Sequence, residues 1–198
     1  MRRPRSPLIA LLPILALAMS AAQGCGTYAR VSLESPLSGA TLRPNLTTTT
    51  YSYRDENTVD IYLTDLTPEE LAIPFDDRAQ GWPTGQLVHI HMFIRPSPGK
   101  TPIEPQASNA TIRHLILAPG ATGLYGGGGF LLPSGGADSG KFGGKITAGT
   151  LRLQASSPNF NDALGPTEIR ASFKVKEDRE LASKIARRFE ESMPRPEG

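Results

Sequence analysis

The stretch EIRASFKVK, residues 168–176, indicates the fold class most clearly. Apolar and polar residues alternate along it: Ile169, Ala171, Phe173 and Val175 are apolar, and Arg170, Ser172, Lys174 and Lys176 lie between them. Successive side chains of a β-strand point to opposite faces, so this period of two predicts a strand with one buried face.

The same period recurs along most of the chain. Strands are predicted at 29–33, 47–53, 59–63, 87–95, 111–118 and 145–155, by this period or, at 47–53, by the β-branched and aromatic residues of TTTTYSY. RDEN, residues 54–57, predicts a turn between the second and third of these runs, which makes them a hairpin, and TPEEL, residues 67–71, predicts a single helical turn capped by Thr67. The 20 glycines and 18 prolines favour turns over long helices. We therefore expect a mainly β fold, an antiparallel sandwich or barrel-like sheet.

One amphipathic helix is predicted near the end of the chain, over about 177–192. Leu181, Ile185 and Phe189 recur every four residues and form an apolar stripe. Pro194 ends the helix, and we expect the tail 193–198 to be loose. The stripe predicts a helix packed against the sheet, and a docking surface for a partner is the alternative.

The N-terminus has the three parts of a secretory signal peptide. MRRPRSP is basic, LIALLPILALAM is apolar, and SAAQG is a run of small residues. The apolar part is shorter than the roughly 20 residues that span a bilayer. We expect residues 1–24 to be a signal peptide and residues 25–198 to form a single extracytoplasmic β-rich domain.

The one cysteine, Cys25, follows these small residues directly. The stretch AQGC resembles the lipobox of bacterial lipoproteins, although Gln23 departs from the usual pattern and Ala22 replaces the more common leucine. The resemblance covers residues 1–25 and implies a lipid anchor at Cys25, with the membrane as a partner. Ala22-Gln23-Gly24 would also serve an ordinary signal peptidase, which would leave a free thiol. The expected location is the bacterial cell envelope, on its periplasmic or outer face.

The charge balance argues against nucleic-acid binding. Three of the 21 basic residues (Arg2, Arg3 and Arg5) lie in the signal peptide, which leaves 18 against 19 acidic residues, a net charge of 18 − 19 = −1. No overall basic field remains to attract nucleic acid.

Two of the three histidines stand in the stretch LVHIHMFIR, residues 87–95. Alternation places Val88, Ile90, Met92 and Ile94 on a core face, and Leu87, His89, His91, Phe93 and Arg95 on the other. Two imidazoles one pleat apart are roughly 6–7 Å apart between Cα atoms, close enough to reach one ion. Neutral imidazole suits zinc and copper.

The third histidine, His114, lies in TIRHLILA, residues 111–118. If the two strands pair, His114 completes a three-histidine zinc or copper site with His89 and His91. Arg95 opposes this reading, because it shares their face and its charge repels a cation. The alternative is that the histidines are half-exposed sheet residues with hydrogen-bond partners nearby.

Two other features suggest surface roles. The tract LYGGGGFLLPSGG, residues 124–136, lacks the context of a phosphate-binding loop, so we expect a mobile loop or a close approach of another backbone. Trp82, the only tryptophan, is either a sugar-stacking platform or a cap on the core edge.

The sequence thus predicts a lipid-anchored envelope protein that is a non-enzymatic binding or interaction module. Its ligand would be an envelope protein or polysaccharide, and its variable surface the loops at 96–110 and 118–144. The alternative is a zinc- or copper-binding protein or metalloenzyme that uses His89, His91 and His114.

Overall fold

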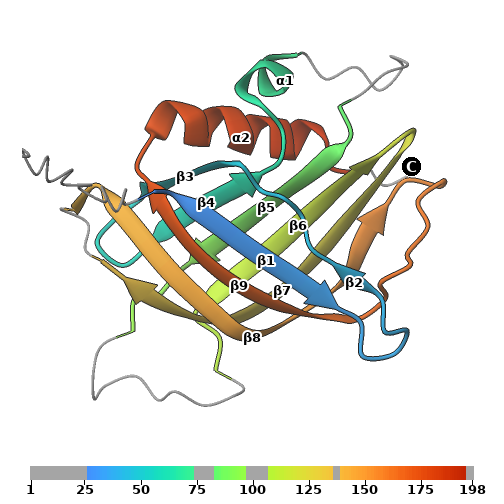
Figure 1. Ribbon diagram of the computed structural model, residues 1–198, viewed down its shortest axis with the longest axis horizontal. Helices are drawn as coiled ribbons and strands as arrows, with labels where there is room; N and C mark the ends of the chain where they lie inside the picture. The colour runs from blue at the N-terminus through green and yellow to red at the C-terminus, as the bar shows by residue number, and fades with distance from the viewer. Residues whose placement is uncertain (1–25, 74–82, 97–106, 136–138, 195–198) are drawn as a thin grey trace, which may run out of the picture.

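The computed structural model describes residues 26–73, 83–96, 107–135 and 139–194. They form one nine-stranded sheet and two helices (Figure 1). The strands are β1 (Tyr28–Glu34), β2 (Thr41–Leu42), β3 (Thr48–Tyr53), β4 (Val59–Thr64), β5 (Gly85–Met92), β6 (Ala110–Ala118), β7 (Ala121–Ser134), β8 (Lys141–Ser156) and β9 (Thr167–Lys176). The helices are α1 (Pro68–Ala72) and α2 (Arg179–Glu191).

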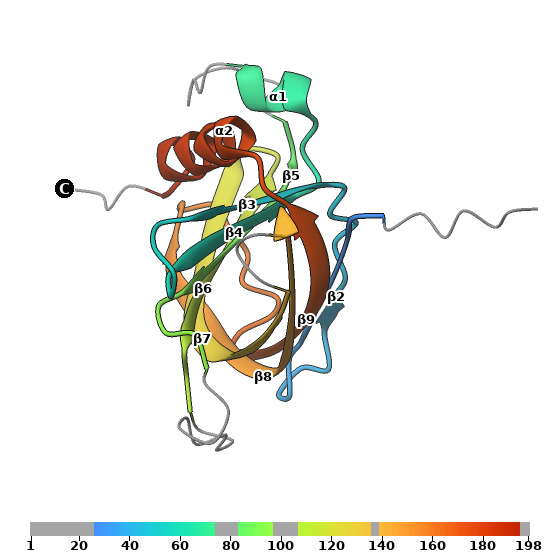
Figure 2. The same cartoon turned by 90° about the vertical axis from the view of Figure 1, so that its left-hand side faces the viewer.

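The sheet is antiparallel throughout and curls into a half-barrel, which confirms the predicted mainly β fold. Its strand order is β2-β1-β9-β8-β7-β6-β5-β4-β3. Consecutive strands are therefore neighbours in the sheet except β2 and β3, which lie at its two edges, and the first and last long strands, β1 and β9, pair with each other. The curl brings β3 close to the end of β9, where Tyr51 and Glu177 form an isolated parallel bridge (Figure 2). The predicted hairpin is present as β3 and β4.

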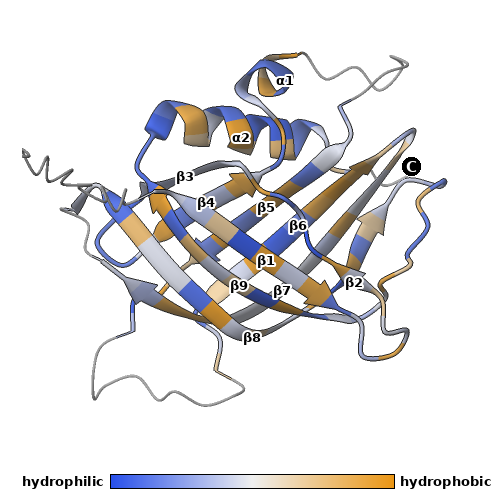
Figure 3. Ribbon diagram, in the orientation of Figure 1, coloured by the Kyte–Doolittle hydropathy of each residue, from blue (hydrophilic) through white to orange (hydrophobic). Residues whose placement is uncertain are grey.

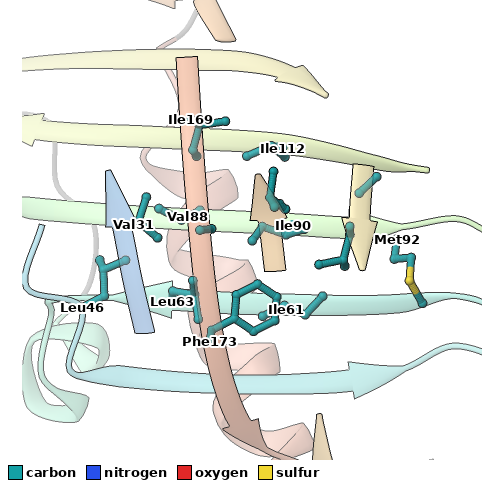
Figure 4. Close-up of a cluster of buried hydrophobic side chains, with 14 of the residues drawn as sticks. Val31, Leu46, Ile61, Leu63, Val88, Ile90, Met92, Ile112, Ile169 and Phe173 are labelled. Carbon is teal, nitrogen blue, oxygen red and sulfur yellow. The ribbon is translucent and has the colours of Figure 1, made fainter. Parts of the chain in front are cut away.

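The concave face of the sheet holds the main core. Strands from distant parts of the sheet meet there: Val31 of β1 packs in the same cluster as Leu63 of β4 and Val88 of β5 (Figure 4). Along β9 the residues Ile169, Ala171, Phe173 and Val175 are buried, as their period predicts. The alternation is visible as changing hydropathy along the strands (Figure 3).

Helix α2 covers part of the convex face and builds a second core. Its buried residues Ile185 and Phe189 pack with Leu87 and Leu115 of the sheet. The predicted packing of the apolar stripe is therefore confirmed. The helix begins two residues later than expected, because the carboxylate of Asp178 accepts a hydrogen bond from the backbone N–H of Leu181 and so caps it.

Helix α1 is the short turn predicted at 67–71. The Thr67 hydroxyl and the Glu70 carboxylate form a reciprocal capping box. The guanidinium of Arg188, on α2, donates hydrogen bonds to the backbone carbonyls of Glu70 and Ile73 and so holds α1 against α2. Neither helix of the described residues is long and apolar enough to cross a membrane.

The glycine tract is a correction to the predicted surface loop at 118–144. Residues 121–134 form β7, which pairs with β6 on one side and β8 on the other. The register shifts between Gly129 and Leu131, and β8 shifts against β9 between Ile146 and Gly149. Glycines and bulges allow strands to bend sharply, so the tract lets β7 follow the curl of the sheet.

The strand predicted at 87–95 also ends earlier than expected. β5 stops at Met92, and Ile94, expected on the core face, is 54% exposed. The backbone N–H of Phe93 still bonds the carbonyl of Asn109, but the ladder goes no further. Alternation of apolar and polar residues therefore predicts which face a side chain lies on only where the strand stays paired with its neighbour.

A glycine substitution tests the close approach of β7 to β8. A Cβ added at Gly127 would overlap the backbone carbonyl oxygen of Thr150, which cannot rotate away. We expect Gly127→Ala to lower the free energy of unfolding by about 3 kcal/mol, measured by urea denaturation. The control is Gly120→Ala, which meets no neighbour but adopts a φ of 67° and should cost only about 1 kcal/mol. Equal losses would contradict the close approach.

Candidate functional site

The structure does not bring the three histidines together. His89 and His91 lie on the convex face of β5, whereas His114 pairs with Val88 and lies on the concave face. The residue of β6 that pairs with His89 is Arg113. The predicted His89, His91 and His114 site is therefore wrong in its third member, because the register sends His114 to the opposite side of the sheet.

Asp60 takes the place expected for His114. It pairs with His91 from the neighbouring strand β4 and is only 3% exposed. Its Oδ1 lies 2.8 Å from His89 Nε2 and 2.8 Å from His91 Nδ1, and its Oδ2 accepts a hydrogen bond of 2.5 Å from Arg54 Nε. One ligand atom from each of Asp60, His89 and His91 lies within 4.8 Å of the other two. The sequence carries one signal for this residue, a charged side chain between Val59 and Ile61.

His89 is enclosed by its neighbours. Its ring stacks on Tyr62 at 4.7 Å between centroids and meets the edge of Phe189 of α2 at 6.1 Å. Arg113 Nη2 lies 3.0 Å from His89 Nδ1. A guanidinium has only donors, so Nδ1 accepts and the ring proton is on Nε2, which donates to Asp60.

The protonation states follow from burial and these hydrogen bonds. Burial by itself raises the pKa of the Asp60 carboxyl, but hydrogen bonds from His89, Arg54 and His91 outweigh it and leave the pKa well below its usual range. Burial lowers the pKa of His89. An ionised Asp60 beside a neutral His89 is therefore the resting state, and Arg54 supplies the balancing charge.

Arg113 links this cluster to the C-terminal helix. Its Nη2 lies 3.1 Å from Glu190 Oε1, and its guanidinium lies 4.8 Å from the centroid of the Phe189 ring. The chain of contacts from Arg54 through Asp60 and His89 to Arg113 and α2 crosses three neighbouring strands. In this state the cluster holds the helix against the sheet.

Asp60, His89 and His91 resemble the ligands of a metal centre, but Arg113 opposes metal binding. Two imidazoles and a carboxylate suit zinc or copper, and the hydrogen bond from Arg54 to Asp60 would orient the carboxylate. To bind a cation through Nε2, His89 must move its proton to Nδ1, which faces the donor Arg113. Arg113 therefore opposes metal binding at His89. His91, whose side chain is 25% exposed, meets no such obstacle among the described residues.

His114 is a separate buried group. It is fully buried, and its Nε2 lies 2.8 Å from Gln86 Oε1. Its Nδ1 has no hydrogen-bond partner among the described residues. Burial lowers the pKa of His114 to about 4, so the ring is neutral near pH 7.

The other two predicted site residues, Cys25 and Trp82, lie outside the described residues. No protein-family model matches the chain, and neither does any curated protein or solved structure compared with it. Its function is therefore inferred from the residues and their geometry.

His114 makes stability depend on pH. The unfolded chain protonates this residue below about pH 6.5, whereas the folded chain resists until about pH 4. Stability is therefore fully present above about pH 6.5 and is lost as pH falls to about 4, by about 3 kcal/mol from this residue. Urea denaturation across this range should show that loss in the parent and a much smaller one in His114→Gln.

The matched control is His91→Gln, which removes an imidazole from the other face and should keep the His114 contribution. Identical pH profiles for the parent and His114→Gln would show that burial does not set the charge of His114.

Proposed function

We propose that the chain is an exported, lipid-anchored binding module of the bacterial cell envelope. The observation that carries this proposal is the position of Cys25, at the end of a signal-like segment and three residues before β1 begins at Tyr28. A chain of three residues spans at most about 11 Å, so a lipid on Cys25 would hold the sheet directly at the membrane.

A binding role fits the arrangement of the polar cluster better than catalysis does. Asp60 and His89 are buried, and their hydrogen bonds are used within the protein. Their contacts hold α2 on the sheet and leave surface residues to meet an envelope protein or polysaccharide. Trp82 stays a predicted part of that ligand surface.

The anchor is tested by labelling the full chain in a bacterial host with a clickable fatty acid. We expect the parent to be labelled and to partition into detergent. Cys25→Ser should do neither, because Cys25 is the only thiol in the sequence. Ser20→Ala is the control, since it alters a neighbouring small residue and leaves the cysteine. A mature parent whose Cys25 reacts with maleimide would show a free thiol and overturn the proposal.

Metal binding is the second candidate, favoured by the three ligand atoms within 4.8 Å of one another. Asp60, His89 and His91 would hold the ion, and the two nitrogens with one oxygen suit zinc or copper. Arg113 must then release His89, so we expect the affinity to rise when Arg113 is removed.

The test is metal content after zinc or copper is added to the purified protein and the excess is removed. If this candidate is right, the parent retains one ion per chain, His89→Asn/His91→Asn retains none, and Arg113→Gln binds more tightly. His114→Asn is the matched control and should retain the ion, because it lies on the other face. Absence of metal from both the parent and Arg113→Gln would eliminate this candidate.

A further inference from the structure

A groove of about 590 Å³ lies where β1, β8 and β9 meet the segment that follows β2. Four cationic residues line it: Arg30, Arg43, Lys145 and Arg170. All four are exposed. The groove contains no acidic residue in its lining.

Strand register extends this charge across the convex face. Residues that pair in an antiparallel sheet point to the same side, so the pairs form rows. One row crosses four strands as Arg30, Ser172, Lys145 and Leu132. The next rows toward the start of β1 contain Tyr28 with Lys174, and Lys176 with Lys141. The inward neighbours Ala29 and Phe173 pack in the core, so these rows face away from it.

The charge changes sign along the strands. At the far end of β1, Glu34 pairs with Glu168, and Glu168 lies 3.6 Å from Arg170 in an exposed ion pair. The basic rows are at the other end, where β1 begins. Cys25 precedes Arg30 by five residues, a distance of at most about 18 Å between their Cα atoms. A chain whose mature net charge is 18 − 19 = −1 therefore gathers cations beside the expected anchor.

Exposed apolar side chains belong to the same rows. Tyr28 is 45% exposed and Leu132 is 38% exposed. Tyrosine rings favour the level of lipid headgroups, and long cationic side chains reach the phosphates while their stems contact apolar groups. Arg43 and Lys145 have no ion-pair partner in the part of the chain that the structure describes. These two cations are therefore available to an anionic ligand.

We propose that this face docks on the anionic phospholipid headgroups of the membrane that holds the lipid of Cys25. The proposal rests on the proposed lipid anchor and adds a second contact to it. A basic patch adds electrostatic attraction to anionic lipids to the hydrophobic attachment of a lipid anchor. The row from Arg30 to Leu132 crosses three strand spacings, roughly 14 Å, which suits several headgroups and exceeds a single phosphate ion.

The test uses residues 26–198 and vesicles of phosphatidylcholine, alone or with phosphatidylglycerol. Every contact described here lies between residues 26 and 194, so this chain contains the whole sheet and both helices. We expect binding to the phosphatidylglycerol vesicles that weakens with salt. Arg30→Gln/Lys145→Gln should bind about 25-fold more weakly, since each cation near such a surface contributes about fivefold.

The matched control is Arg152→Gln/Lys184→Gln, which changes charge equally but outside the basic rows. Its binding should stay near that of the parent. Equal binding to both kinds of vesicle, or equal losses in the two double variants, would overturn the docking proposal. Full competition by inorganic phosphate would also overturn it, because the site would then take the free ion.

A second measurement uses the full lipidated chain in the same vesicles. Acetylation of Lys145 should be slowed by phosphatidylglycerol, whereas Lys184 on α2 should react as before. If Cys25 carries the fatty-acid label but phosphatidylglycerol does not slow acetylation of Lys145, the docking proposal is overturned and the anchor proposal stands. Vesicle binding by residues 26–198 without labelling of Cys25 would support the basic face and remove the anchor.

Discussion

The structure depends on burying one apolar face of a large sheet with very little helix to cover it. α2 is the only long helix among the described residues, and it packs on the convex side. The concave side must therefore be covered by the sheet itself, and curling brings residues of β1 against those of β4 and β5. The glycines and register shifts of β7 and β8 follow from this need, because a strand without bulges or glycines does not bend so sharply.

The convex face contains a buried carboxylate, which needs hydrogen-bond partners. Asp60 is almost fully buried, and an unpaired charge there would be costly. His89, His91 and Arg54 form hydrogen bonds with this carboxylate, and Arg113 extends the network to α2. The same arrangement points a carboxylate and two imidazoles toward one another. The atoms that connect the sheet to α2 are therefore also the atoms that could bind a metal ion. The direction of the Arg113 hydrogen bond separates the two, because it decides which nitrogen of His89 carries the proton.

The two ends of strand β1 have different roles in the proposed function. The start of β1 joins the expected anchor, the basic rows lie beside it, and the acidic pair Glu34 and Glu168 lies at the other end. A protein held this way would present its basic end to the membrane and its opposite end to the envelope. The small net charge hides this arrangement, since it averages over faces that the fold separates.

The sequence by itself determined most of the strands, the hairpin of β3 and β4, the capped turn at Thr67 and the stripe of α2, because each depends on residues near one another in the chain. It also showed that His89 and His91 share a face. Only the tertiary structure decided that Asp60 joins them and that His114 does not, since strand register depends on pairing between distant segments. The sequence left the glycine tract open between a mobile loop and a close approach of another backbone for the same reason: only pairing with β6 and β8 selects the strand, and the loop predicted at 118–144 was wrong there.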